Sequence, residues 1–273
     1  MSNLVTRTVS GAVFLCILLS GIIFHPFGYG FILLAIIIAG LHEFYGMLLP
    51  KSFPVRKILG YTISITLFAL FYLQGLGLLS GNYFWILIVP AGGVFVAELY
   101  SRSETPFSNI SGVLAGAIYV ALPFSLTTEL TMPAHDGNYD YRIFLSLFIF
   151  LWSNDVGAYC FGMMFGRGGR HKLFERISPG KSWEGFFGGV IASLLAALIL
   201  SSVWGDRYVF DRLHWFVLAA VVSLSGTFGD LAESMLKRAA GVKDSGKIIP
   251  GHGGVLDRFD SALFAFPFSL SYI

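Results

Sequence analysis

The chain has 273 residues, of which 55% are hydrophobic and only 12% are charged, with a formal net charge of +2. A soluble domain carries about 25% charged residues, so this chain has too little polar surface for a soluble protein of its size. The same arithmetic excludes a disordered, collagen-like, coiled-coil or disulfide-rich secreted chain, and the near-neutral charge argues against nucleic acid as a partner. The composition predicts an all-α, polytopic integral membrane helical bundle with the lipid bilayer as its solvent.

About nine segments are candidates for transmembrane helices, which need roughly 20 mostly apolar residues. In chain order they are 9–24, 29–49, 58–79, 84–100, 110–130, 143–165, 186–204, 213–229 and 259–273. We expect residues 1–140 to form the N-terminal transmembrane helices. Residues 141–273 would form a C-terminal catalytic region with cytoplasmic polar loops, within one membrane unit.

The distribution of Lys and Arg predicts the orientation. With nine spans, 15 basic residues fall in the N-terminus and in the loops after even-numbered spans, whereas Arg142, Arg207 and Arg212 fall on the other side. The 15 are Arg7, Lys51, Arg56, Lys57, Arg102, Arg167, Arg170, Lys172, Arg176, Lys181, Lys237, Arg238, Lys243, Lys247 and Arg258. Because positively charged loops stay in the cytoplasm, the N-terminus is expected to be cytoplasmic. The loops 166–184 and 237–258, which also contain glycines and acids, would form a polar working surface on that face.

Carboxylates within membrane spans are costly unless they are paired, hydrated or metal-bound, and each is a functional candidate. Five qualify: Glu43, Glu98, Asp155, Asp230 and Glu233. The simpler interpretation of Glu43 and Glu98 is a position at the membrane interface. Asp155 lies in the middle of an apolar run with Gly157 and Gly162 after it, which favours a close helix contact or a water-filled cleft. The alternative is a buried Asp that neighbouring hydroxyls satisfy.

A polar stripe extends the eighth span. If its helix continues through Arg238, then Asp230, Glu233, Ser234 and Lys237 share one face. The stripe suits a metal with an anionic ligand. It equally suits an intrahelical ladder of ion pairs, although a ladder explains Glu233 with Lys237 and leaves Asp230 without a partner.

The loop after this stripe is rich in glycine and charge. Glycines such as Gly253 and Gly254 let backbone amides approach a phosphate closely. Asp257, Asp260 and Ser261 share one face if the last helix begins there, and carboxylates with few other ligands indicate Mg²⁺. His252 is expected to contact a ligand or form a turn, because no His or Cys partner lies at zinc spacing.

The segment 178–185 contains Gly-Lys-Ser but lacks the first glycine of a nucleotide P-loop, because position 175 is Glu. Ser182 is a plausible helix N-cap at the start of the seventh span, where a helix attracts anions. An ordinary membrane-helix cap explains these residues as well, and both interpretations stay open at this point.

A longer pattern resembles the signature of the phosphatidate cytidylyltransferases, also called CDP-diacylglycerol synthases. It consists of Ser234-x-Leu236-Lys237-Arg238, four residues, Lys243-Asp244, and then Pro250-x-His252-Gly253-Gly254-x-x-Asp257-Arg258-x-Asp260. The runs 154–159 and 178–185 also resemble that family. The likeness covers about the C-terminal half of the chain.

The resemblance implies a multi-pass enzyme of the inner (plasma) membrane, a nucleotidyltransferase of phospholipid biosynthesis that is often a homodimer. It would join CTP to phosphatidic acid with Mg²⁺, giving CDP-diacylglycerol and pyrophosphate at a site facing the cytoplasm. In this interpretation Asp230 and Asp257 hold Mg²⁺, and Asp155, Glu233 and Asp260 support them. Phosphate neutralisation is assigned to Lys181, Lys237, Lys243 and Arg258, with Arg238 among the substrate-binding residues. Hydrogen bonds would come from Ser182, His252, Gly253 and Gly254, and Asp244 would orient a lysine or contact the nucleotide.

Three other classes of function compete with this interpretation. A CDP-alcohol phosphotransferase needs an Asp-Gly-x-x-Ala-Arg run, which this sequence lacks. A transporter of ions or anionic solutes is the main alternative, because intramembrane acids also serve carriers; Asp155 is the residue that favours it. A structural membrane subunit would have no reason to keep so many desolvated charges.

Overall fold

The structure is a computed structural model of the chain and describes every residue except 1–2, 50–53, 102, 167–170 and 206–210. Five residues used above to predict orientation, Lys51, Arg102, Arg167, Arg170 and Arg207, lie outside the described residues. The chain divides into two compact units. The first contains Met1–Tyr141 and Ala240–Phe259, and the second contains Arg142–Ala239 and Asp260–Ile273. The signature segment is therefore shared between the two units.

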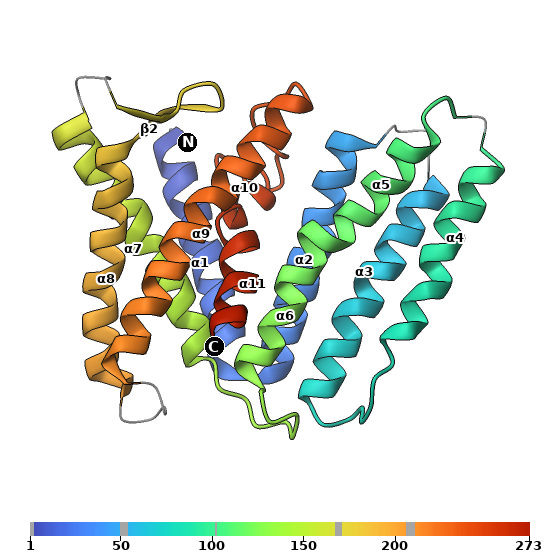
Figure 1. The fold of residues 1–273 in the computed structure, drawn as a ribbon, viewed down its shortest axis with the longest axis horizontal. Coiled ribbons are helices and arrows are strands. Elements are labelled where there is room, and N and C mark those ends of the chain that lie inside the picture. Colours follow the sequence, from blue (N-terminus) through green and yellow to red (C-terminus); the bar gives the residue numbers. More distant parts are fainter. Residues whose placement is uncertain (1–2, 50–53, 102, 167–170, 206–210) are drawn as a thin grey trace. The chain divides into compact units, whose positions relative to one another are not determined.

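The first unit is a bundle of antiparallel helices (Figure 1). Its long helices are α1 (Asn3–Phe24), α2 (Pro26–Leu48) and α3 (Pro54–Gly75). Next come the 3₁₀ turn η1 (Phe84–Leu87) with α4 (Ile88–Leu99), and then a continuous run of α5 (Pro106–Gly116), the π-helical turn η2 (Ala117–Ala121) and α6 (Leu122–Thr131). The short helix α10 (Leu256–Phe259) packs against α2.

Proline begins three of these helices. Pro26, Pro54 and Pro106 are the first residues of α2, α3 and α5, where the missing N–H costs nothing because the first N–H groups of a helix have no partner within the helix. His25 caps α2, with its Nδ1 accepting a hydrogen bond from the Phe27 N–H at 3.2 Å. Local sequence thus accounts for where these membrane helices start.

The second unit packs α7 (Arg142–Phe165), α8 (Trp183–Trp204) and α9 (Arg212–Ala239) side by side, with α11 (Ala262–Tyr272) against α9 (Figure 1). A two-stranded antiparallel hairpin of β1 (Lys172–Phe174) and β2 (Ser178–Ser182) precedes α8. Small residues allow α7 and α8 to meet closely. A Cβ on Gly157 would lie 2.6 Å from the Gly188 carbonyl oxygen, so the close contact expected at Gly157 is confirmed.

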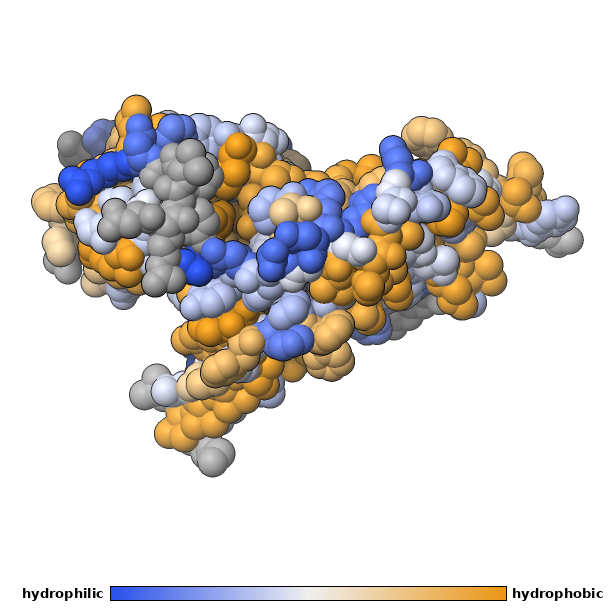
Figure 2. Space-filling model, turned by 90° about the horizontal axis from the view of Figure 1, so that it is seen from below, coloured by the Kyte–Doolittle hydropathy of each residue, from blue (hydrophilic) through white to orange (hydrophobic). Residues whose placement is uncertain are grey.

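The prediction of an all-α membrane bundle is confirmed. Eight of the nine predicted spans fall mainly on a helix or a continuous helical run, and seven described helices are long and apolar enough to cross a membrane. The run Phe84–Leu99 is a shorter apolar helix, and α11 has only 11 residues. Broad hydrophobic areas cover much of the visible surface in Figure 2, as expected for helices that face lipid.

Two expectations about helices have clear outcomes. Helix α9 does continue through Arg238, ending at Ala239. The single helix expected from residue 259 onward is wrong, because α10 ends at Phe259 and α11 starts at Ala262. At this break the Ser261 N–H donates to Asp260 Oδ1 at 2.6 Å, a local side-chain bond that competes with helical pairing. Asp257 and Asp260 therefore do not share a face of one continuous helix.

Candidate active site

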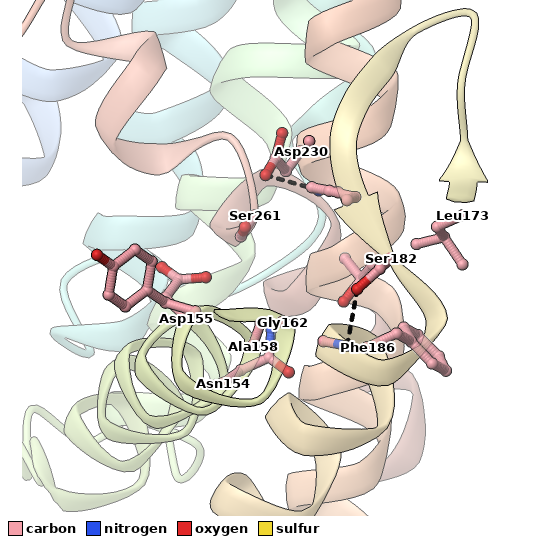
Figure 3. A pocket seen from close by; sticks show the side chains of 14 residues that line it. Asn154, Asp155, Ala158, Gly162, Leu173, Ser182, Phe186, Asp230 and Ser261 are labelled. Carbon is pink, nitrogen blue, oxygen red and sulfur yellow. Dashed lines mark hydrogen bonds and ion pairs between the residues drawn. The ribbon is translucent and has the colours of Figure 1, made fainter. Parts of the chain in front are cut away.

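A cavity of about 210 Å³ lies within the second unit (Figure 3). Its walls come from the middle of α7, the β-hairpin, the start of α8, the middle of α9 and the start of the last segment. Asp155, Lys181, Ser182, Asp230 and Ser261 all line it. Charged and hydroxyl groups from four separate parts of the chain, all singled out above, therefore surround one space in which a small polar ligand fits.

The hairpin carries Lys181 to this cavity. Lys181 belongs to β2, and its Nζ lies 2.7 Å from Asp230 Oδ2 in α9, the contact drawn as a dashed line in Figure 3. Both side chains stay about one quarter to one third exposed, so a ligand can reach them. At the base of the hairpin, the Trp183 N–H donates to the His171 carbonyl oxygen at 3.0 Å. Composition and helical periodicity did not indicate this hairpin, because three- and five-residue strands are too short to show a period.

Ser182 is the N-cap of α8. Its Oγ accepts a hydrogen bond from the Gly185 N–H at 3.2 Å, which confirms the cap expected from sequence. The cap starts the helix at Trp183, three residues before the predicted start of the span. Because the positive end of the α8 dipole then lies at the cavity wall, it adds to the attraction that Lys181 offers to an anion.

Helix α9 carries the predicted polar stripe. Lys237 Nζ lies 2.6 Å from Glu233 Oε2, and both side chains are almost fully buried, so the ion-pair ladder is present for these two residues. Ser234 Oγ donates to Asp230 Oδ1 at 3.3 Å. Asp230 is not left without a partner as a ladder alone would leave it, because the hairpin supplies Lys181.

Asp260 and Ser261 lie close to this stripe within the second unit. A Cβ on Gly229 would lie 2.7 Å from the Asp260 carbonyl oxygen, so glycine lets the segment approach α9 next to Asp230. Burial raises the pKa of Asp260, and the nearby carboxylates of Asp230, Glu233 and Asp155 raise it further. Negative charge is thus concentrated around Asp230, which favours the binding of a cation there.

A group of three or more His, Cys, Asp or Glu placed to hold a metal ion is absent among the described residues. Mg²⁺ does not require such a cage, because it usually binds through one or two carboxylates and takes its other ligands from water and substrate phosphates. The oxygen donors of Asp230 and the surrounding excess of negative charge fit that pattern.

The glycine-rich loop of the signature lies in the first unit and is organised around Glu43 of α2. This carboxylate accepts three hydrogen bonds of 2.9 Å, from the Ser245 hydroxyl, the Val255 N–H and the Leu256 N–H. It is only 4% exposed. The loop folds over the carboxylate and replaces water with its own donors, so Glu43 is enclosed by protein near the end of α2. Its position at the membrane interface stays a prediction. Sequence gave no local signal for this contact, since the partners are more than 200 residues apart.

Glu98 is also 4% exposed, and its position at the membrane interface likewise stays a prediction. It forms an ion pair with Arg56 and accepts a hydrogen bond from Asn109 Nδ2 at 3.0 Å. A buried carboxylate needs such partners to offset its desolvation. Its environment is therefore that of a structural ion pair within the first unit.

Asp257 is a second carboxylate that accepts hydrogen bonds from the signature loop. Its Oδ2 accepts hydrogen bonds from the Ser245 N–H at 3.0 Å and the Gly254 N–H at 2.8 Å. Asp257 belongs to the first unit and Asp230 to the second, and each unit is described by itself. The shared Mg²⁺ ion expected from the sequence stays a prediction.

The remaining predicted residues of the loop surround a second, larger cavity of about 510 Å³ in the first unit. Asp244, His252, Gly253 and Arg258 line it. Lys243 is exposed on the same loop, and Arg238 is exposed near the end of α9. Arg7 also lines this cavity, although the sequence indicated for it only a role in membrane orientation.

Asn154 lines the cavity in the second unit, and its structural role became visible only in the structure. It is buried at the α7–α8 contact, and its Oδ1 accepts a hydrogen bond from Ser223 Oγ at 2.5 Å. This bond fixes the turn of α7 that carries Asp155. The neighbouring Asp155 is exposed to the cavity rather than buried, so the interpretation of a buried Asp satisfied by hydroxyls is wrong.

Comparison with known proteins adds an independent line of argument. Residues 5–273 match the Cytidylyltransferase family. The chain is 34% identical over 278 residues to the phosphatidate cytidylyltransferase of Haemophilus influenzae, covering 96% of each chain. It is 37% identical over 195 residues to the protein of that name from Staphylococcus epidermidis, covering 67% of this chain and 69% of the relative. For the Staphylococcus saprophyticus protein the identity is 40% over 169 residues, with 61% and 60% covered.

Proposed function

The chain belongs to the cytidylyltransferase family, and we propose that it condenses CTP with phosphatidate to give CDP-diacylglycerol and pyrophosphate. The single observation that supports a phosphate-handling site most directly is the Lys181–Asp230 pair at 2.7 Å, held over a cavity at the N-terminus of α8. It combines a cation for phosphate with a carboxylate for a metal. Asp155, the residue that favoured a carrier, lines the same cavity and so belongs to this site.

The nucleophile of this reaction requires little activation by the protein. A phosphatidate oxygen, already anionic, forms a bond to the α-phosphorus of CTP, and the bond from that phosphorus to the bridging oxygen of the β-phosphate breaks. The electron pair leaves with pyrophosphate. Positioning and neutralisation of charge then supply most of the rate enhancement.

The residues of the second unit can be given roles in this step. Lys181 would exchange its contact with Asp230 for a phosphate oxygen of CTP. The backbone N–H groups at the start of α8 would face the same anion. Asp230 would hold Mg²⁺, which when bound supplies positive charge against the phosphates. Asp155 and Asp260 would add to the field that retains the ion.

Substrate chemistry supports the location of the site. CTP is soluble and anionic, whereas phosphatidate is confined to the bilayer, so both reach a common site only at the membrane surface. We propose the cytoplasmic face of the inner (plasma) membrane for that site, because basic loops favour the cytoplasmic side of a membrane. A homodimer stays a prediction from the family resemblance.

The direct test uses detergent-solubilised full-length protein with phosphatidate, Mg²⁺ and CTP labelled at the α-phosphate. We expect label in a lipid product without any sealed compartment. Asp230→Asn should lower kcat by about two orders of magnitude or more, the scale of losing one group that stabilises charge in the transition state. Asp211→Asn is the matched control, because Asp211 is an exposed carboxylate just before the other end of α9. Absence of labelled lipid with the wild-type chain contradicts the proposal, and a near-normal Mg²⁺-dependent rate in Asp230→Asn contradicts the role of that residue.

A further inference from the structure

The first unit contains a basic pocket and an apolar groove that adjoin each other. The basic pocket is the cavity of about 510 Å³ lined by Arg7, Asp244, Lys247, His252 and Arg258 together with loop glycines. The apolar groove has a volume of about 270 Å³ and lies along α1 and α2. Residues that line it include Phe14, Ile17, Phe31, Ala35, Ala39 and Ile249.

Two observations show that the pocket leads into the groove. Ile249 lines both. Helix α1 also passes along both, because Arg7 lines the pocket, and Phe14 and Ile17 line the groove. These three side chains share one face of the helix, and the eleven residues from Arg7 to Ile17 span about 15 Å.

Specific contacts hold the signature loop against α1 where the basic pocket meets the apolar groove. Ser10 of α1 lies between Arg7 and Phe14, and its Oγ lies 2.8 Å from the Pro250 carbonyl oxygen and 3.1 Å from His252 Nδ1. A Cβ on Gly11 would lie 3.2 Å from the His252 ring, so the glycine lets the loop rest against the helix. The signature loop and α1 therefore form one continuous surface within this unit.

The charge of the pocket selects an anion. Arg7, Lys247 and Arg258 bring three cations against the single carboxylate of Asp244. Gly251 and Gly253 have φ values of +77° and +83°, which expose loop backbone that a side chain would otherwise crowd.

The basic pocket and the apolar groove lie at different positions along the candidate span of α1. Arg7 is the first residue of the candidate span Arg7–Phe24, so the pocket lies at its polar end. The groove lies further along the span, and Ile17 and Phe31 are 58% and 74% exposed there. An anionic headgroup at the pocket and a hydrocarbon chain in the groove match this order.

We propose that the basic pocket binds the phosphate of an anionic phospholipid and that the apolar groove holds one of its acyl chains. Naming that lipid as phosphatidate rests on the proposed function. Arg7 then becomes a substrate-binding residue. Lys247 joins it at the phosphate, and Ala35 and Ala39 leave room for the chain.

The test measures steady-state kinetics of the full-length protein in mixed micelles, with CTP and phosphatidate varied in turn. Arg7→Ala should raise the KM for dioleoyl phosphatidate about tenfold, the effect of losing one charge-assisted hydrogen bond, and leave the KM for CTP within about twofold. Arg7→Lys should recover part of the loss because it keeps the charge. Lys57→Ala is the control for a basic residue of the same unit that lines neither space.

A second variant tests the groove. Ala35→Phe should raise the KM for dioleoyl phosphatidate severalfold and leave that for dihexanoyl phosphatidate unchanged, because a short chain does not extend along the groove. Ile38→Phe adds the same ring at an exposed position of α2 that does not line the groove. Equal effects of Ala35→Phe and Ile38→Phe, or equal effects on both chain lengths, would overturn the groove assignment.

Binding without turnover separates this inference from the proposed function. Native mass spectrometry of the wild-type protein should show dioleoyl phosphatidate retained in preference to dioleoyl phosphatidylcholine, and weakened retention in Arg7→Ala. Inorganic phosphate should not displace the lipid at equal concentration. If Arg7→Ala instead raises only the KM for CTP, the pocket is a nucleotide site and the inference is wrong. Selective lipid retention by a chain that forms no CDP-diacylglycerol would refute the proposed function alone.

Discussion

Replacing Glu43 by Gln changes one atom of a buried side chain and should disable the signature loop. The carboxylate accepts three hydrogen bonds, two at Oε2 from Ser245 and Leu256 and one at Oε1 from Val255. The amide of Gln has only one oxygen. When that oxygen takes the place of Oε2, the NH₂ group faces the Val255 N–H, and two donors oppose each other in a site that water does not reach.

The magnitude follows from these contacts. One buried donor left unsatisfied costs about 1–3 kcal/mol, and bonds to a charged acceptor are stronger than bonds to a neutral one. We therefore expect the closed loop to lose about 2–3 kcal/mol, equivalent to roughly a 30- to 140-fold fall in its equilibrium constant for closure. Glu43→Ala is the poorer experiment, because it removes all three bonds and leaves a cavity.

The assay combines turnover of labelled CTP with thermal unfolding of the same detergent-solubilised preparation. Glu98→Gln is the matched control. Glu98 lies in the same unit and is also 4% exposed, but it pairs with Arg56 and contacts Asn109 rather than the signature loop. Glu98→Gln should lower the unfolding temperature at least as much as Glu43→Gln does, since breaking a buried ion pair costs about 3–5 kcal/mol. Activity per folded molecule should stay near that of the wild type.

Normal kcat and KM values in Glu43→Gln would refute the role of Glu43 in holding the loop. An equal loss of activity per folded molecule in Glu98→Gln would refute it as well, because the loss would then follow global stability rather than the loop.

Three further outcomes are expected. Lys181→Ala should lower kcat/KM at least tenfold while changing the free energy of unfolding by about 1 kcal/mol or less, since its ion pair with Asp230 is partly exposed; unchanged kinetics for both substrates would leave Lys181 only a topological role. The raised pKa of Asp260 means that the folded chain binds more protons than the unfolded chain above about pH 4, so stability in EDTA should fall as pH rises from there. Asp260→Asn should weaken this dependence of stability on pH and reduce the rise in unfolding temperature on adding Mg²⁺. If both the pH dependence and the rise stay unaltered, the proposed concentration of negative charge around Asp230 is contradicted. Gly254→Ala should abolish activity, because the new Cβ would overlap the Ser245 hydroxyl and the Glu43 carboxylate. The control Gly46→Ala should be tolerated, because no atom lies within 4 Å of its Cβ. An active Gly254→Ala variant would show that the loop can open without loss of activity.

Local sequence was sufficient for the membrane character and for several helix boundaries. Apolar runs of about 20 residues have few alternatives to a membrane helix, because every backbone polar group must be paired inside the bilayer. The cap at Ser182 and the polar face of a helix continued through Arg238 could both be inferred from the sequence, since both depend on residues within two helical turns. The signature over 234–260 identified the family for a similar reason, because its spacings are read along the chain.

Contacts between distant segments were beyond such reasoning. The hairpin that brings Lys181 to Asp230 joins positions 49 residues apart, and Glu43 meets donors 202 to 213 residues away. Nothing in a local pattern distinguishes a carboxylate at the interface from one enclosed by a returning loop. The adjoining basic pocket and apolar groove likewise depend on how the 240–259 segment packs against α1 and α2. The sequence determined which groups carry charge and which segments enter the bilayer, but tertiary packing decided which charges meet, because the energy of a buried carboxylate depends on the donors that surround it in space.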